Sequence, residues 1–209
     1  MAQPGAVAVH DHGHHDHGAH AVPYTTTGLP MLKVGFWVFL GSETLFFGTF
    51  IAAYMVYKNE SVVGPYSHEL LNIPLTSIST FVLLMSSLAM VLALDALQHR
   101  TRAQAVGWTV ATATLGLLFL GFQAFEFTHF YHEGLTLQTN LFGSTFFVLT
   151  GFHGAHVSIG VMWLLMLAVD IMRGKLQPGD SLRLEIAGLY WHFVDIVWIV
   201  IFTLIYLME

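Results

Sequence analysis

Five long apolar segments dominate the sequence, and short polar connectors separate them. An α-helix needs about 20 mainly apolar residues to cross the hydrocarbon core of a bilayer. The segments that meet this length cover residues 34–57, 73–97, 107–130, 143–171 and 184–207. Pro74 falls in the first turn of the second segment, where its missing N–H group is tolerated. The pattern predicts an all-α polytopic membrane protein with five transmembrane helices.

The composition supports this fold class and excludes several functions. The chain is 55% hydrophobic and 10% charged, with a mean hydropathy of +0.66, whereas soluble domains carry about 25% charged residues. The net charge of −6 comes with no basic patch, which argues against a nucleic-acid partner. The sequence has no cysteine, so disulfides, thiolate-bound clusters and thiol chemistry are excluded.

The cationic residues predict how the helices are oriented. Six of the seven Lys and Arg residues fall on one side of the predicted membrane, and only Lys58 falls on the other. Cytoplasmic loops carry the excess of Lys and Arg, so we expect the N-terminus inside and the C-terminus on the periplasmic or extracellular side. The six cations of the inner side are Lys33, Arg100, Arg102, Arg173, Lys175 and Arg183.

Residues 1–32 form a polar segment that we expect to be a disordered His-rich tail, with the five-helix domain at residues 33–209. Such tracts can bind zinc, copper or nickel, but the spacing here fixes no coordination geometry. Weak metal binding is therefore favoured over a dedicated role in metal delivery. The histidines concerned are His10, His12, His14, His15, His17 and His20.

Ionisable side chains inside apolar segments are costly, so each is a functional candidate. Glu43 stands alone in the first segment, about 14 Å from its inner end. No Lys or Arg lies within the five segments. We therefore expect Glu43 to be protonated or hydrogen-bonded to a buried neighbour. Its role is either proton exchange or a structural hydrogen bond between helices.

Glu126 and His129 are three residues apart near the outer end of the third segment, on one helix face. Di-iron bundles use this Glu-x-x-His spacing, but they need two copies and further glutamates. The sequence has one copy within its apolar segments. We therefore favour a structural, hydrogen-bonding pair over a metal site.

Two further pairs follow the same spacing: His153 with His156, and His192 with Asp195. The first pair lies among glycines, which let helices approach closely, and a carboxylate near a histidine can orient the ring. A haem or copper site would need partners on other helices. Buried polar groups that support helix packing are favoured.

At these residues the sequence resembles subunit III of the haem–copper terminal oxidases, the cytochrome c oxidase type. The similarity covers residues 36–54, 115–127, 142–160 and 188–207, in four of the five segments. Its most specific parts are GSTFFVLTGFHGAHV and YWHFVDIVW. The family has seven-helix and five-helix forms, and this chain resembles the shorter bacterial form. In the longer form two additional helices wall a lipid-filled cleft, which here would be absent or supplied by another subunit.

The resemblance implies roles for particular residues. Glu43 matches a buried glutamate that reacts with carbodiimide in relatives, and Arg173 matches an arginine that holds a lipid headgroup. Five polar residues match family positions that support packing and lipid contact, and none is a redox-metal ligand: Glu126, His153, His156, His192 and Asp195. Haem and copper belong to subunits I and II, so this chain itself would carry no metal cofactor, only bound phospholipid.

The implied protein is a non-catalytic subunit of a cytochrome c oxidase in the bacterial plasma membrane, which reduces oxygen to water and pumps protons. It would contact mainly subunit I, and also subunit II, a small subunit IV and phospholipids. The alternatives are subunit III of a quinol oxidase or a subunit of a nitric oxide reductase. A stand-alone proton-coupled carrier lacks support because no inverted repeat is evident, and a membrane metallo-oxygenase would need several His-rich boxes at the membrane boundary.

Overall fold

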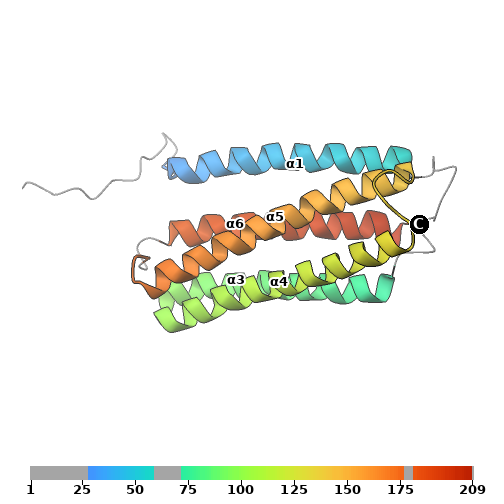
Figure 1. Ribbon diagram of the computed structural model, residues 1–209. Helices are drawn as coiled ribbons and strands as arrows, with labels where there is room; N and C mark the ends of the chain where they lie inside the picture. The colour runs from blue at the N-terminus through green and yellow to red at the C-terminus, as the bar shows by residue number, and fades with distance from the viewer. Residues whose placement is uncertain (1–27, 59–71, 177–180, 209) are drawn as a thin grey trace, which may run out of the picture.

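The computed structural model describes residues 28–58, 72–176 and 181–208, and these residues form a bundle of long helices (Figure 1). The His-rich tail lies outside the described residues. Five helices are long and apolar enough to cross a membrane, as the apolar pattern predicted. They are α1 (Met31–Tyr57), α3 (Ile73–His99), α4 (Arg102–His132), α5 (Leu141–Met172) and α6 (Leu182–Phe202), which continues into the π-helix η2 (Thr203–Leu207).

The helices extend slightly beyond the predicted apolar segments, and polar side chains cap the first turns of three of them. Asn72, Thr101 and Asn140 each accept a hydrogen bond from a backbone N–H in the first turn of the helix that follows. Helix α1 begins at Met31, two residues before the predicted domain boundary at residue 33. The last turns of α6 are wound as a π-helix, which periodicity does not predict.

Helices that are adjacent in sequence run antiparallel, and α5 crosses the bundle obliquely (Figure 1). Helix α4 packs between α3 and α5, while α6 packs against α3, α5 and α1. Helix α1 packs on α5 and α6 through Leu40, Phe47 and Tyr54, which repeat every seven residues. The six cations predicted for one side lie at or near the helix ends on the left in Figure 1.

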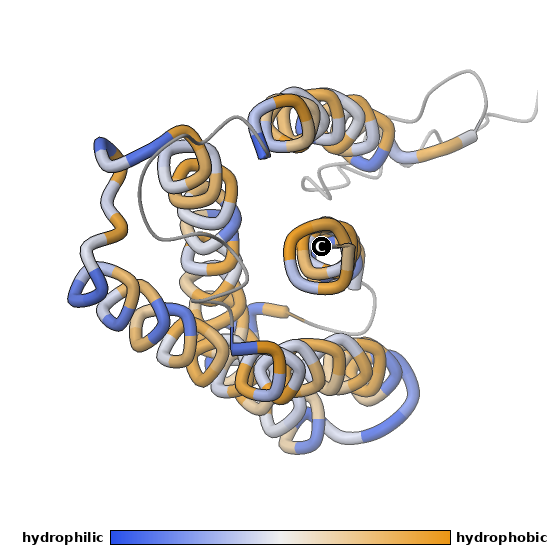
Figure 2. The backbone as a smooth tube through the Cα atoms, turned by 90° about the vertical axis from the view of Figure 1, so that its right-hand side faces the viewer, coloured by the Kyte–Doolittle hydropathy of each residue, from blue (hydrophilic) through white to orange (hydrophobic). Residues whose placement is uncertain are grey.

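The core of the bundle is built around one tryptophan. Trp191 of α6 is almost fully buried and lies against Gly116 of α4 and Gly160 of α5. Its indole Nε1 donates a hydrogen bond to the Ser86 hydroxyl of α3 at 2.9 Å. Small residues let the backbones approach this ring, so four helices meet at one point. Many large hydrophobic side chains of these helices are exposed, which suits contact with lipid, and most of the helical residues are coloured as hydrophobic in Figure 2.

Candidate functional site

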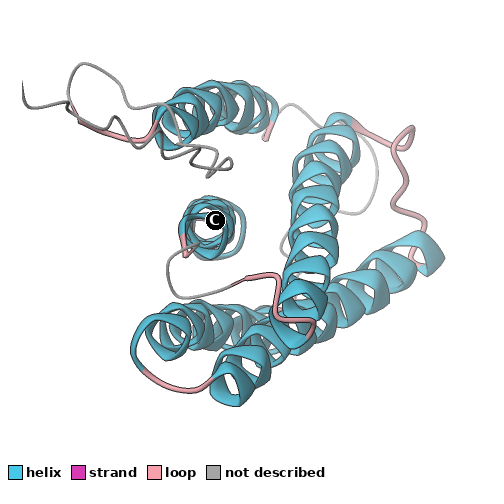
Figure 3. Cartoon of the chain, turned by 90° about the vertical axis from the view of Figure 1, so that its left-hand side faces the viewer, coloured by secondary structure: helices cyan, strands magenta, loops and turns pink. Residues whose placement is uncertain are grey.

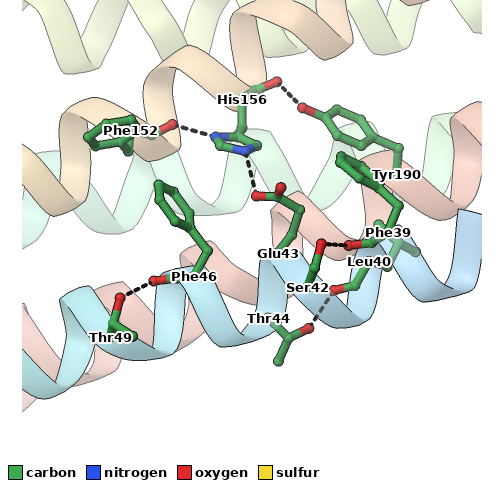
Figure 4. Close-up of polar contacts among 10 residues, drawn as sticks. All are labelled: Phe39, Leu40, Ser42, Glu43, Thr44, Phe46, Thr49, Phe152, His156 and Tyr190. Atoms are coloured by element: carbon green, nitrogen blue, oxygen red, sulfur yellow. Dashed lines mark hydrogen bonds and ion pairs between the residues drawn. The ribbon is translucent and has the colours of Figure 1, made fainter.

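Glu43 meets His156 in the middle of the bundle, where α1 contacts α5 (Figure 4). The carboxylate Oε2 of Glu43 lies 3.1 Å from Nε2 of His156. The hydroxyls of Ser42, Thr44 and Thr49 on α1 bond instead to carbonyls of their own helix. Among the described polar side chains in the middle of α1, Glu43 is therefore the one that links this helix to another.

The contacts of His156 assign the hydrogen on one of its two ring nitrogens. The Nδ1 atom of His156 lies 2.7 Å from the backbone carbonyl of Phe152, which can only accept, so Nδ1 carries a hydrogen and donates it. One proton then lies between Nε2 and the Glu43 carboxyl. It belongs either to a neutral Glu43 that donates to the ring, or to a cationic ring that donates to a carboxylate. Both arrangements have no net charge, which lowers the cost of placing the pair in hydrocarbon.

Aromatic rings enclose the pair on the protein side. The Phe47 ring lies 4.9 Å from the His156 ring in an edge-on arrangement. Tyr190 of α6 donates its hydroxyl to the backbone carbonyl of His156 at 3.0 Å. The two side chains retain 15% exposure for His156 and 19% for Glu43. Side chains of α1, α5 and α6 thus surround the shared proton. The pair is still partly exposed at the surface of the subunit.

A second buried carboxyl, Glu126 of α4, lies near the opposite end of the bundle from the cluster of cations. Its Oε1 accepts hydrogen bonds from Thr76 of α3 at 3.0 Å and from Tyr206 of η2 at 2.9 Å. His129, in contrast to its expected buried position, is exposed. Three residues advance a helix by 300°, so His129 is turned about 60° away from Glu126 and past the edge of the packed face.

His153 and Asp195 are buried at 0% and 3% exposure. The His153 ring stacks on Trp198 at 4.8 Å and meets Phe119 edge-on at 5.7 Å. Neither ring nitrogen of His153 and neither oxygen of Asp195 has a hydrogen-bond partner among the described residues. Both side chains are enclosed by the bundle, and their role in helix packing stays a prediction.

His192, three residues before Asp195 on α6, is half-buried. Its Nδ1 lies 2.6 Å from the hydroxyl of Ser87 on α3. The Ser87 hydroxyl is also close to the Asp195 carboxyl, without the geometry of a hydrogen bond to either oxygen. His192 and Asp195, which the sequence placed on one helix face, thus both lie beside Ser87 of α3.

Arg173 follows the end of α5 and is exposed. It lines one end of a groove of ≈ 670 Å³ between α4 and α5, whose other walls are mainly Leu, Val and Met side chains, with Ser158 and Asp170 as the polar members. The Arg102 guanidinium lies beside Gly174, the residue that follows Arg173. An apolar groove that ends at an arginine has the shape and chemistry to hold an acyl chain and a phosphate.

Sequence reasoning did not find Ser87, Thr76, Tyr190 or Tyr206, although each bonds to one of the candidate residues or to its backbone. Hydroxyl side chains are common in membrane helices, so no spacing distinguishes these four. Among the described residues, no three His, Asp or Glu side chains come together in an arrangement that could hold a metal ion.

Comparison with known proteins is consistent with this geometry. The described fold and its paired polar groups define a polytopic membrane subunit with a five-helix core. A profile of the family Cytochrome c oxidase subunit III matches residues 12–209, nearly the whole chain. The chain therefore belongs to the subunit III family of the haem–copper oxidases, as the sequence motifs indicated, and it is a protein of the bacterial plasma membrane.

The relatives include subunits of two kinds of oxidase. Quinol oxidase subunit 3 of Bacillus subtilis (strain 168) is 39% identical over 198 residues, which covers 95% of this chain and 97% of that protein. Cytochrome c oxidase subunit 3 of Alkalihalophilus pseudofirmus is 40% identical over 178 residues, covering 84% and 85%. Cytochrome c oxidase subunit 3 of Bacillus sp. (strain PS3) is 38% identical, covering 84% of each chain.

Proposed function

We propose that this chain is the non-catalytic subunit III of a proton-pumping terminal oxidase, and that Glu43 holds an exchangeable proton there. The observation that carries the proposal is the Glu43–His156 pair, because it holds one proton between two helices without net charge. Haem and copper are proposed to lie in partner subunits. The subunit would stabilise the catalytic subunit and support proton uptake, and it would have no active site of its own.

Which electron donor the oxidase uses would be determined by its partner subunits. The relatives divide between quinol oxidases and cytochrome c oxidases at nearly equal identity. Cytochrome c is the donor expected from the family resemblance, and the names of several relatives support quinol equally well. A subunit without a redox centre accepts electrons from neither donor. Its sequence therefore does not identify the donor.

The groove beside Arg173 supports a lipid-binding role. Its apolar walls match an acyl chain, and Arg173 at its end matches a phosphate group. Replacing Arg173 with Gln is expected to lower the number of phospholipids that stay bound to the purified complex. Native mass spectrometry of the complex measures that number, and replacing the exposed Arg183 with Gln is the matched control.

Purification of the complex through this chain in mild detergent tests the whole proposal. We expect a haem-containing subunit to co-purify, with oxygen consumption supported by reduced cytochrome c or by a quinol. The optical spectrum gives the haem type, and the two donor assays assign the donor. A homogeneous chain without haem that transports protons alone would instead identify a carrier, and activity with nitric oxide would identify a nitric oxide reductase.

A further inference from the structure

One side of helix α6 is not covered by any other described helix. The two end-on views show α6 near the centre, with α1 above it and α3 and α4 below it, and one side open (Figures 2 and 3). Three residues of α6 at helical spacing form an exposed apolar stripe: Ile196 is 60% exposed, and Ile199 and Val200 are each 40% exposed. His192 belongs to the same stripe, one turn before Ile196.

His192 is the polar residue of this stripe in the middle of the membrane. It lies ten residues after Leu182, the first residue of α6, which places it about 15 Å along the helix and near the centre of a core about 30 Å thick. Its Nδ1 is engaged by Ser87, but its Nε2 has no hydrogen-bond partner among the described residues.

Other polar side chains on exposed faces form hydrogen bonds within their own helix. Thr114 and Thr128 of α4 bond to carbonyls of their own helix, and Ser158 of α5 does the same. Such residues can face lipid without a partner. The Nε2 of His192 cannot be satisfied in this way, because the ring is already held at Nδ1 by a serine of the neighbouring helix.

Lipid acyl chains offer no hydrogen bond, so the imidazole and the stripe around it call for a protein neighbour. We propose that the open face of α6, formed by His192, Ile196, Ile199 and Val200, is the surface against which another membrane-spanning oxidase subunit packs. That subunit would place a hydrogen-bonding side chain opposite Nε2 of His192 at mid-membrane. This assignment builds on the proposed function, because it takes the partner to be the haem-bearing subunit.

The test compares two tryptophan substitutions in the intact complex. Ile196→Trp adds bulk on the open face, while Leu118→Trp adds the same bulk at a position of α4 that is 51% exposed, on a helix that packs mainly against α3 and α5. A bulky apolar side chain is tolerated by lipid but not within a packed interface. We expect Ile196→Trp to lower the haem that co-purifies per chain about tenfold, and Leu118→Trp to leave it unchanged.

A second pair of variants isolates the hydrogen bond. His192→Leu removes the polar ring, whereas His192→Gln keeps groups that can donate and accept. We expect His192→Leu to lower the co-purified haem and His192→Gln to retain most of it. Size-exclusion profiles of the variant subunits show whether each is still folded, so that loss of the partner is separated from loss of the fold.

Three results would overturn the assignment. Wild-type haem content in both Ile196→Trp and His192→Leu would show that the face contacts lipid. Because the sequence has no cysteine, Ile199→Cys introduces a unique thiol, and a disulfide between two copies of this chain would assign the face to self-association. Loss of haem only in Leu118→Trp would place the partner on α4. If the wild-type chain itself brings down no haem, the proposed function fails before the face is tested.

Discussion

Single residues in this subunit are distinguished by whether they find a partner on another helix. Glu43 and His156 satisfy one another across α1 and α5, and Glu126 is satisfied by two hydroxyls from α3 and η2. In hydrocarbon an unbonded polar group is costly, so these partners lower the cost of burying Glu43, His156 and Glu126. The same principle makes the unbonded nitrogen of His192 informative.

Replacing Glu43 with Gln is expected to preserve assembly, because the amide can still donate to Nε2 of His156. The exchangeable proton is lost, so proton pumping per electron or resistance to inactivation during turnover should fall modestly. Proton release by the oxidase in liposomes and its activity over repeated turnovers measure these two quantities. Unchanged pumping and lifetime at every pH would leave Glu43 with a structural role alone.

Two other substitutions at the same position serve as references. Glu43→Ala leaves the His156 ring without its partner, which should cost about 1–3 kcal/mol of stability. Glu43→Lys leaves an uncompensated positive charge beside His156 in hydrocarbon, and it should prevent assembly. Recovery of intact complex after solubilisation ranks the three variants, and equal recovery of all three would contradict the pairing.

At the scale of elements, close packing around Trp191 sets the spacing of α4, α5 and α6. A Cβ atom added at Gly116 would lie 2.6 Å from the Trp191 ring, and one added at Gly160 would lie 2.9 Å from it. Both separations are too short for carbon atoms, and the ring is held by its hydrogen bond to Ser86. The glycines are therefore required by contact between helices and not by backbone conformation.

Gly116→Ala should therefore destabilise the bundle by about 1–3 kcal/mol, the usual cost of overpacking a core. Gly41→Ala is the matched control, because a Cβ atom at Gly41 meets no other atom within 4 Å and alanine favours a helix. Thermal unfolding in detergent, followed by tryptophan fluorescence, compares the two. A Gly116→Ala variant as stable as Gly41→Ala would refute the close contact.

The π-helix η2 at the end of α6 carries Tyr206, whose hydroxyl donates a hydrogen bond to Glu126. Tyr206→Phe should lower stability by about 0.5–1.5 kcal/mol, and combining it with Thr76→Val should cost more than the sum, since Glu126 then loses both donors. Unfolding of the two single variants and the double variant measures this coupling. Tyr131→Phe, at an exposed position, should have no effect.

At the scale of the whole molecule, α1 is the least embedded helix. Only 11% of its most apolar window is buried, compared with 33% to 50% for the other four helices. Its attachment combines the apolar contacts on α5 and α6, the Glu43–His156 pair, and an ion pair between Lys33 and Glu185 of α6. Helix α1 should therefore be the first to separate when the bundle opens.

Reversing the charge of Lys33 tests this attachment. Lys33→Glu faces Glu185 with a like charge and should speed backbone hydrogen exchange in α1, while the double variant Lys33→Glu with Glu185→Lys should restore the slow rate. The pair is partly exposed, at 27% and 33%, so its contribution is at most about 1 kcal/mol and should shrink at high salt. Mass spectrometry measures the exchange rate of α1, with α5 as the internal reference. Equal α1 exchange rates in the wild type and both variants would contradict the pairing.

Much of the fold could be predicted from the sequence, whereas little of the candidate site could. The five spans follow from apolar length alone, since the bilayer sets how many residues a helix needs. The importance of Glu43 and Glu126 could be inferred from their cost in hydrocarbon, but their partners could not. His156 lies 113 positions from Glu43, and Thr76 and Tyr206 carry hydroxyls that no pattern marks.

The sequence by itself determined the number of crossings, the collection of cations at one end of the bundle and the set of ionisable residues within the membrane. These properties depend on hydrophobicity and length, which act residue by residue along the chain. Only the tertiary structure decided that Glu43 bonds to His156, that His129 turns outward and that His192 keeps one nitrogen unbonded. Those outcomes depend on how helices rotate and cross, and that is set by the packing of rings such as Trp191 against glycines on neighbouring helices.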